Sequence, residues 1–313
     1  MTKSLPSIVV LGGINMDFIC HTDRLPFPGE TVVGSQFYVE PGGKGANQAV
    51  AAAKMGAFVQ MVGSVGTDRF GDELVNSLEE KGVDTRSVFR VDNCDSGAAL
   101  IVLNGQGENH IVAVYGANVE SSEKYLEIAE EVLEGADVLM LQLEVPSAVS
   151  LEFAKIAKRL DVKVIWDPAP AVGFPDNAYA VTDVLVPNQV EAEFLTGIEV
   201  VDVNSARKAG DMLLEFGVGL VVVKLGGAGS LIVTRNESHY VPAIGIDVSD
   251  TIAAGDAFAG AMAVTLAEGK PIGIAIKYGV AAGALAVSRK GAQNAMPGRY
   301  EVDQLMTDRL VDL

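Results

Sequence analysis

The stretch SIVVLGG, residues 7–13, is a short apolar run that ends in two glycines, as a buried strand followed by a turn does. Similar runs follow along the chain: FVQMVGS (58–64), DVLMLQL (137–143), VKVIW (162–166), DVLVP (183–187) and LVVVKLGG (220–227). Segments with helical patterns lie between them: GANQAVAAAKMG (45–56), FGDELVNSLEEKG (70–82), SLEFAKIAKRL (150–160) and NSARKAGDMLLEFG (204–217). This alternation predicts a three-layer α/β fold, in which helices cover both faces of a mostly parallel sheet. Ligands of such sheets bind at the carboxyl ends of the strands.

One region breaks the alternation of strands and helices. Residues 97–118, GAALIVLNGQGENHIVAVYGAN, hold two β-rich arms around an Asn- and Gly-rich turn, and residues 30–40 also have a strand pattern. These segments predict either an extra hairpin at an edge of the sheet or a small β-sheet lid that excludes water from a site. We expect one α/β domain over residues 1–313, with a lid built from about residues 15–41 and 93–119, because no Pro- or Ser-rich linker divides the chain.

Composition narrows the functional classes. The chain has 313 residues, of which 49% are apolar and 20% charged, and a net charge of −18, which argues against binding to nucleic acid. Cys20 and Cys94 are too few for a disulfide scaffold, and His21, His110 and His239 lie without the spacing of zinc ligands. We expect a soluble, cytoplasmic protein with no membrane partner, because the sequence has no signal-peptide pattern and no uninterrupted apolar run of about 20 residues.

The common nucleotide-binding motifs are absent. The pattern G-x-x-x-x-G-K-[ST] fails because Lys44 is followed by Gly45 and Lys270 by Pro271. The pattern G-x-G-x-x-G fails at its last glycine in both GKGANQ and GAGSLI. Both a P-loop enzyme and an ordinary dinucleotide-binding dehydrogenase are therefore disfavoured.

Polar residues nevertheless gather where the predicted strands end. PGGKGANQA (41–49) puts three glycines and a lysine before a helix, which suits either a plain turn or a cradle for a ligand, and its Asn47 could bind sugar hydroxyls or lie at the surface. GGINMD (12–17) offers an amide and a carboxylate for a polyol, although both residue types also form turns. Glu144 in QLEVP follows an apolar strand, where a carboxylate needs a partner or a wet cleft.

Two further turns have alternative readings. In VPNQVEAEF (186–194), Asn188 and Glu191 could lie near phosphate and Mg²⁺, or could form a capping box at the start of a helix. KLGGAGSL (224–231) could be a simple hairpin turn or backbone that passes closely under a nucleotide.

The stretch DTIAAGDAFAG, residues 250–260, carries the strongest indication of chemistry. The N–H groups of Ala254, Gly255 and Asp256 lie where a helix begins, and the positive end of a helix suits a phosphoryl oxygen. Asp256 could then take the proton from an attacking hydroxyl, or it could simply cap the helix.

Taken together, GGINMD, PGGKGANQA, PNQVEAE, DTIAAGD and SRKGAQ resemble, in order and spacing, the ribokinase branch of the phosphofructokinase-B family of sugar kinases, from about residue 7 to 300. The resemblance implies a sugar site made of Asn15, Met16, Asp17, Gly43, Lys44, Gly45, Ala46, Asn47, Glu144 and Asp256. It implies that Asp256 is the catalytic base beside an anion hole formed with Ala253, Ala254 and Gly255. For ATP it implies Asn188, Lys224, Leu225, Gly226, Gly227, Ala228, Gly229, Gly255 and Val280.

The same resemblance implies metal sites and an assembly. Glu191 would order Mg²⁺ through water. A monovalent cation, normally K⁺, would be held largely by carbonyl oxygens at Asp250, Ile252, Ala286, Arg289, Gly291 and Ala295. The lid would also form the interface of a homodimer. Three positions depart from the family pattern: Val280 replaces a histidine near adenine, Ala295 a serine near the cation, and Lys224 a threonine near the phosphates.

The implied activity is ATP-dependent phosphorylation of D-ribose at O5, with Asp256 as the base. The alternatives are a kinase of another sugar or nucleoside, such as deoxyribose, fructose or an adenosine-type nucleoside, and a sugar-binding regulator without catalysis. Release of ADP in the presence of a panel of sugars and nucleosides distinguishes these three functions.

Overall fold

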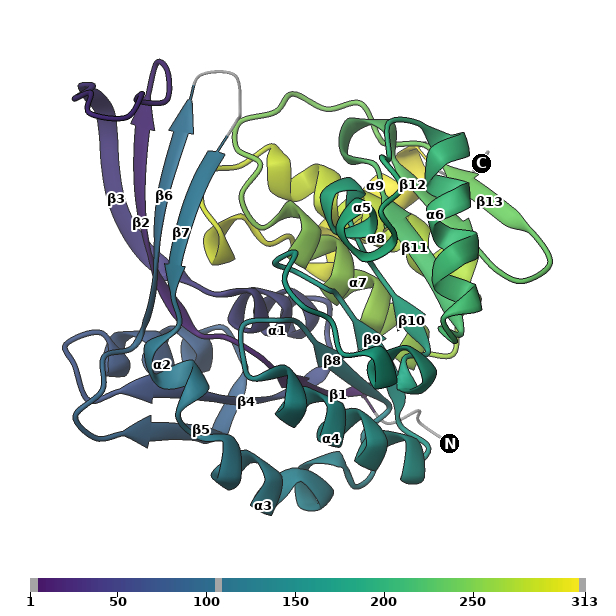
Figure 1. Ribbon diagram of the computed structural model, residues 1–313, viewed down its shortest axis with the longest axis horizontal. Helices are drawn as coiled ribbons and strands as arrows, with labels where there is room; N and C mark the ends of the chain where they lie inside the picture. The colour runs from purple at the N-terminus through teal and green to yellow at the C-terminus, as the bar shows by residue number, and fades with distance from the viewer. Residues whose placement is uncertain (1–4, 105–108, 310–313) are drawn as a thin grey trace.

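The computed structural model describes residues 5–104 and 109–309 (Figure 1). Within them, nine strands form a sheet in the order β13-β12-β11-β10-β9-β8-β1-β4-β5. The strands are β1 Ser7–Leu11, β4 Phe58–Gly66, β5 Asp84–Val91, β8 Val138–Leu141, β9 Lys163–Trp166, β10 Val184–Leu185, β11 Leu220–Lys224, β12 Ser230–Val233 and β13 Ser238–Val241. Neighbouring strands from β5 to β11 pair in parallel, and β12 and β13 are antiparallel. All the strands predicted from apolar runs lie in this sheet, so the predicted fold class is confirmed.

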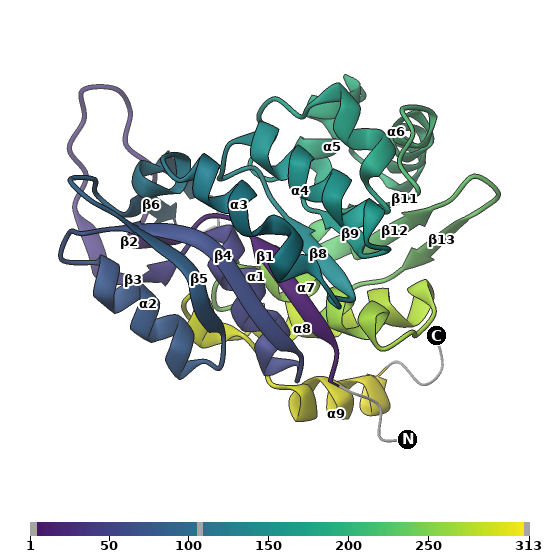
Figure 2. The same cartoon turned by 90° about the horizontal axis from the view of Figure 1, so that it is seen from below.

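Helices cover both faces of the sheet (Figure 2). They are α1 Lys44–Lys54, α2 Gly71–Glu80, α3 Ser122–Leu133, α4 Ser147–Arg159, α5 Gln189–Thr196, α6 Val203–Glu215, α7 Ala254–Ala267, α8 Ile272–Val287 and α9 Arg299–Arg309. The side chains of β1 show why two helical layers are needed. Ile8 and Val10 lie in one core with α1, α2, α7 and α8. Val9 and Leu11 point to the other face and lie in a second core with α3–α6. None of the helices in the described ranges combines the length and the apolar character needed to cross a membrane.

Helices α1 and α7 approach each other closely because small residues line their contact. A Cβ atom placed on Gly260 of α7 would lie 2.6 Å from the Cβ of Ala51 and 2.9 Å from the backbone nitrogen of Ala52. Only a glycine fits at this crossing. The approach brings the first turns of the two helices together at the carboxyl ends of the central strands, where the polar motifs lie.

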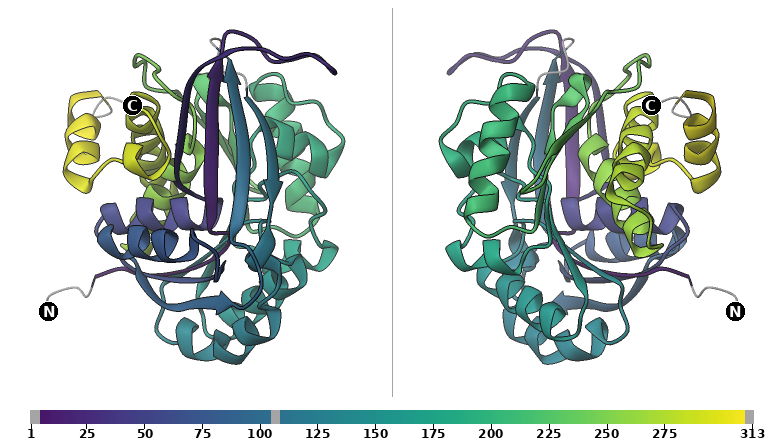
Figure 3. Two further views of the ribbon diagram at one scale, coloured as in Figure 1. Left: turned by 90° about the vertical axis from the view of Figure 1, so that its left-hand side faces the viewer. Right: turned by 90° about the vertical axis from the view of Figure 1, so that its right-hand side faces the viewer.

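Four other strands form a separate sheet in the order β3-β2-β6-β7, which stands upright beside the main body of the molecule (Figures 1 and 3). Their bounds are β2 Asn15–Thr22, β3 Gly34–Gly42, β6 Gly97–Asn104 and β7 Asn109–Val114. The alternative of an extra hairpin at an edge of the main sheet is therefore wrong. The central part of the predicted turn, residues 105–108, lies outside the described residues. On one face of this sheet Ile19 and Ile101 are buried and pack near Ile252, so this face is turned toward the helical body.

Candidate active site

The four segments expected to bind a sugar meet in one place. The backbone N–H of Lys44 donates to Oε2 of Glu144 at 2.7 Å, and Nδ2 of Asn15 lies 3.5 Å from Oε1 of the same carboxylate. Nδ2 of Asn47 donates to Oδ2 of Asp256 at 3.1 Å. The start of β2, the first turn of α1, the segment after β8 and the first turn of α7 therefore form one polar cluster.

Glycines before α1 make room for this cluster. Gly43, the residue before the first turn, has a φ of 90°, and a Cβ on it would lie 2.6 Å from the carbonyl oxygen of Gly13. A Cβ on Gly42 would lie 2.0 Å from Oδ2 of Asp17. The glycines expected to form a cradle thus allow the chain to turn tightly against a buried carboxylate.

Burial controls the charges of the cluster. Burial raises the pKa of Glu144 to about 7, despite the opposing effect of Lys44, and it raises the pKa of Asp17 well above its ordinary value. Burial lowers the pKa of Lys44, but the surrounding carboxyl groups, chiefly Asp256 and Glu144, together outweigh burial and raise that pKa above its ordinary value. Lys44 is consequently a protonated cation among several carboxyl groups, which is an arrangement suited to an anionic transition state.

Asp256 is not the helix cap. Helix α7 begins at Ala254, so Asp256 is the third helical residue, and its oxygens accept hydrogen bonds from Asn47 and from Nε2 of Gln48, the latter at 3.1 Å. Oδ1 of Asn47 is buried and has no partner among the described residues, which leaves it available to accept from a hydroxyl group. The capping alternative for Asp256 is thus wrong.

The residue at the actual cap position is strained. Ala253 has a φ of 57°, in the left-handed region that alanine seldom adopts, and its side chain makes no capping hydrogen bond. The first N–H groups of α7 are therefore not capped by Ala253, as an anion hole requires. Backbone strain of this kind often accompanies a functional site.

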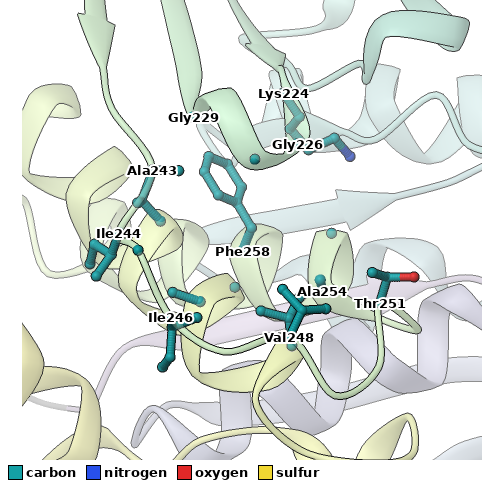
Figure 4. A pocket seen from close by; sticks show the side chains of 17 residues that line it. Lys224, Gly226, Gly229, Ala243, Ile244, Ile246, Val248, Thr251, Ala254 and Phe258 are labelled. Carbon is teal, nitrogen blue, oxygen red and sulfur yellow. The ribbon is translucent and has the colours of Figure 1, made fainter. Parts of the chain in front are cut away.

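A largely apolar cavity of about 510 Å³ adjoins this turn (Figure 4). It is lined by expected residues, which are Lys224, Gly226, Gly227, Gly229, Ala254, Gly255 and Val280. It is also lined by residues that the sequence did not indicate, which are Ala243, Ile244, Gly245, Ile246, Val248, Thr251, Phe258, Gly283, Ala284 and Val287. In Figure 4 the ring of Phe258 points from α7 between the glycine turn and the segment that carries Ala243 and Ile244. Apolar walls beside a glycine turn suit a nucleobase followed by phosphates.

Several expected site residues have other roles. Asn188 and Glu191 form a reciprocal capping box at the start of α5, with Glu191 accepting from Asn188 through both carboxylate oxygens at 2.7 and 2.8 Å, so that alternative is confirmed. Asn188 also bridges to Lys224 at the edge of the glycine turn.

Four other expected residues do not offer their side chains to a ligand. The side chains of Met16, Ala46 and Leu225 are buried in the hydrophobic cores. Ala228 is exposed, and its carbonyl oxygen accepts a hydrogen bond from Tyr240. Only the backbone of the three buried residues could contact a ligand.

The residues expected to hold a monovalent cation lie near one another. The buried carboxylate of Asp250 accepts from the N–H of Ile252 at 2.9 Å and of Gly291 at 3.3 Å. The N–H of Asp250 donates to the carbonyl oxygen of Val287 at 3.1 Å, next to Ala286. Arg289 pairs with Glu301, so its side chain points away toward α9, and Ala295 is buried and has no side-chain oxygen to offer.

The sequence did not indicate four buried polar residues beside the site. Asn118 donates through Nδ2 to Oδ1 of Asn15 at 2.8 Å and thereby orients this residue. Gln48, Gln142 and Asp167 form a connected group next to Asp256. Gln142 and Asp167 follow apolar strands, which is the signal that drew attention to Glu144. Gln48 lies in a run of alanines and gives no local signal.

The chain also has relatives of known activity. The family described as pfkB family carbohydrate kinase matches residues 5–299. The ribokinase of Haemophilus influenzae is 39% identical over 296 residues, covering 94% of this chain and 96% of that protein. The deoxyribokinase of Salmonella typhi is 35% identical over 301 residues, covering 96% of this chain and 98% of that protein.

Solved structures agree with this similarity. The Arabidopsis thaliana ribokinase complexed with ribose and ATP superposes with a TM-score of 0.86 at 32% identity, covering 97% of this chain and 99% of that one. The resemblance inferred from the motifs is confirmed along nearly the whole chain: it belongs to the pfkB family of carbohydrate kinases.

Proposed function

We propose that this kinase transfers the γ-phosphoryl group of ATP to O5 of D-ribose. The observation that carries the proposal is the position of Asp256, which belongs to the polar cluster and also to the first turn of α7, whose N-cap residue makes no side-chain capping bond. A sugar hydroxyl that contacts Asp256 would face this turn, where a phosphoryl group could bind. The named activities of the similar ribokinases support the choice of ribose.

The polar cluster is the proposed sugar site. Asn15, Asp17, Asn47 and Glu144 offer amide and carboxyl groups that can exchange hydrogen bonds with vicinal hydroxyls. Lys44 and the backbone of Gly43 and Gly45 complete the wall on the side of α1. The large number of polar groups in a small buried volume suits a free sugar, every carbon of which carries an oxygen.

The apolar cavity is the proposed ATP site. The glycine turn Gly226–Gly229 lets backbone approach the nucleotide, and Val280 gives the base an apolar contact. The ammonium group of Lys224 lies at the end of the cavity nearest α7, since a Cβ on Gly255 would be 3.6 Å from Nζ. Lys224 thereby places a positive charge where the phosphates must pass.

In this mechanism most of the rate acceleration comes from positioning and charge. Phosphoryl transfer passes through a loose transition state, so the attacking hydroxyl keeps its proton until late in the step. Asp256 then accepts that proton, while Lys44 and the N–H groups of α7 stabilise negative charge on the transferring group. The bond between the γ-phosphorus and the bridging oxygen breaks as the bond to O5 forms, and ADP leaves.

We propose two metal ions on the basis of the family resemblance. Both oxygens of Glu191 are engaged in the capping box, so this carboxylate could order Mg²⁺ only through water, and the ion would neutralise phosphate charge. The buried carboxyl group of Asp250, which accepts from the N–H groups of Ile252 and Gly291, would suit K⁺ together with neighbouring carbonyl groups. Equal rates in K⁺, Na⁺ and Li⁺ would contradict the second site.

The small sheet supports two further proposals, that it closes over the sugar as a lid and that it joins two subunits. One of its faces is buried against the body, whereas the other exposes apolar side chains: Phe37 is 67%, Leu100 56%, Val112 62% and Val114 62% exposed. Adjacent exposed apolar side chains of this kind mark an interaction surface. Sedimentation of the protein as a monomer at micromolar concentration would contradict the homodimer.

The two cysteines bear on the cellular compartment. Cys20 and Cys94 are both free thiols. Free thiols suit a reducing compartment, and we propose the cytoplasm. Fractionation that recovers the protein outside the cytoplasm would contradict this.

A coupled assay of ADP release tests the proposed substrate. Ribose should give the highest kcat/KM among ribose, deoxyribose, fructose and adenosine. Deoxyribose is the second candidate because the Salmonella typhi relative is named as a deoxyribokinase. Preference for deoxyribose would transfer the assignment to that sugar, and binding of sugar without ADP release would indicate a regulator without catalysis.

A further inference from the structure

Gln48 occupies a junction in the floor of the active site. It lies on α1 and is completely buried. Its Nε2 atom donates both of its hydrogens, one to Oδ1 of Asp256 at 3.1 Å and one to Oδ2 of Asp167 at 3.0 Å. Its Oε1 atom accepts from Nε2 of Gln142 at 2.7 Å. Every polar atom of the Gln48 side chain is therefore engaged.

The chemistry of the neighbours fixes the orientation of this amide. Two carboxylates face one end of Gln48. An ionised carboxylate can accept hydrogen bonds but cannot donate them. A flipped amide would put its carbonyl oxygen against both of them. Gln142 donates to the opposite end and so favours the same orientation. A glutamate in this place would add a third negative charge and lose both donated hydrogen bonds.

Beyond Gln48, the contacts continue to the nucleotide side. Oδ1 of Asp167 accepts from Nζ of Lys224 at 2.8 Å, and both side chains are nearly buried, with 3% and 14% exposed. Lys224 in turn borders the first turn of α7 at Gly255. The chain of contacts thus starts at the base, passes through Gln48 and Asp167, and returns to the same helix at the position proposed for the phosphoryl group.

We propose that Gln48 is a positioning residue of the reaction, which fixes the Asp256 carboxylate and, through Asp167, sets the Lys224 ammonium group at a defined place opposite it. The inference rests on the proposed role of Asp256 as the base. Charge-assisted hydrogen bonds from one amide to both carboxylates hold these groups in place, as a preorganised site requires. Asp167 acts on the nucleotide side through its ion pair with Lys224.

This arrangement predicts how the acidity of the base responds to mutation. Burial raises the pKa of Asp256, and so does the charge of Asp167, whereas Lys44 and the hydrogen bonds from Asn47 and Gln48 lower it. The other charged or titratable groups that face Asp256 are Asp17, Glu144 and Lys224. Removal of Gln48's donors should raise the pKa of Asp256, and removal of the charge of Asp167 should lower it.

The test is the pH dependence of kcat/KM for the preferred sugar in Gln48→Met and Asp167→Asn. Gln48→Met should lower kcat by about 10- to 100-fold, because the hydrogen bonds to the base and to Asp167 are both lost. The acidic limb of its pH profile of kcat/KM should move to higher pH. Asp167→Asn should move the same limb to lower pH, because a negative charge disappears and Lys224 is released toward the base. A loss of stability alone would not move the acidic limb in opposite directions in the two variants.

Gln60→Met is the matched control, since Gln60 is a partly buried glutamine on β4 whose amide donates to Ser87 away from the site. It should keep the wild-type limb. Where Gln48→Met does not fold, Gln142→Met removes only the partner of Oε1 and should give a smaller shift in the same direction. The inference would be overturned if the acidic limbs of Gln48→Met and Asp167→Asn coincided with that of the wild type. It would also be overturned if Gln60→Met showed the same shift. Full activity of Asp256→Asn would instead overturn the base assignment itself, so the two failures are distinguishable.

Discussion

The two halves of the site meet at the first turn of α7 and are built from opposite kinds of residue. The polar half contains Asn15, Asp17, Lys44, Asn47, Glu144 and Asp256, and the apolar half contains the glycine turn Gly226–Gly229 with Ile244, Ile246, Phe258 and Val280. In the polar half, specific hydrogen bonds and buried charges determine the geometry. In the apolar half, shape and contact area do so. Changes to single atoms should therefore have larger effects in the polar half.

The halves also differ in how they respond to protons. Buried carboxyl groups with raised pKa values make the polar half sensitive to pH, whereas the apolar half is lined by a single ionisable side chain, Lys224, among the described residues. The ion pair of Lys224 with Asp167 connects the two halves.

The largest expected effect comes from removing the base in the polar half. Asp256→Asn should lower kcat by about 10²- to 10⁴-fold, because the amide cannot accept the hydroxyl proton, while leaving the affinity for ATP nearly intact. Steady-state kinetics and calorimetric titration with a non-hydrolysable ATP analogue measure the two quantities. Asp211→Asn on α6 removes an exposed carboxylate and is the control. Near-normal turnover of Asp256→Asn would show that both halves can work without this carboxylate.

The second effect concerns the stability of the unliganded protein. Because burial raises the pKa of Glu144 from 4.5 to about 7, its contribution to stability is fully present below pH 4.5 and is lost as the pH rises through 7. Between pH 5 and pH 8 the free energy of unfolding of the wild type should fall by about 2 to 3 kcal/mol more than that of Glu144→Gln. Urea denaturation at the two pH values measures this difference. Equal pH dependence in both proteins would contradict the burial of this charge.

A smaller effect is expected in the apolar half. Gly229 has a φ of 104°, and a Cβ on it would lie 2.2 Å from the carbonyl oxygen of Val241, so Gly229→Ala must shift the glycine turn. ADP should bind about tenfold more weakly, with the KM of the sugar unchanged. Gly273→Ala on α8 is the control, since a Cβ there meets no described atom within 4 Å. A parallel rise in the KM of the sugar would show that the halves are not separable.

Sequence reasoning found the polar half better than the apolar half, for a physical reason. A polar residue after an apolar run is costly to bury unless it has a partner or faces a wet cleft, so Glu144 and Asp17 stand out. The same signal exists at Gln142 and Asp167 and could have been used. Ile244 and Phe258 give no such signal, because an apolar side chain in a ligand cavity has the same local pattern as one in the core.

Tertiary contacts account for the rest of what could not be predicted. Gln48 acquires its role only when α1 packs against α7, and residues 41–49 alone do not show that contact. The small sheet was expected, yet its separation from the main sheet depends on the pairing of β2 with β6, which lie far apart in the sequence. Conversely, Asn188 and Glu191 were predictable as a capping box because that interaction is local.

A crystal structure with ribose and a non-hydrolysable ATP analogue tests the central claim most directly. The distance to measure is that from the terminal hydroxyl oxygen of the sugar to the Asp256 carboxylate. We expect it to be about 2.6 to 3.2 Å, with the γ-phosphoryl group facing the N–H groups of Ala254 and Gly255. A sugar bound elsewhere, or with its terminal hydroxyl directed away from Asp256, would contradict the account.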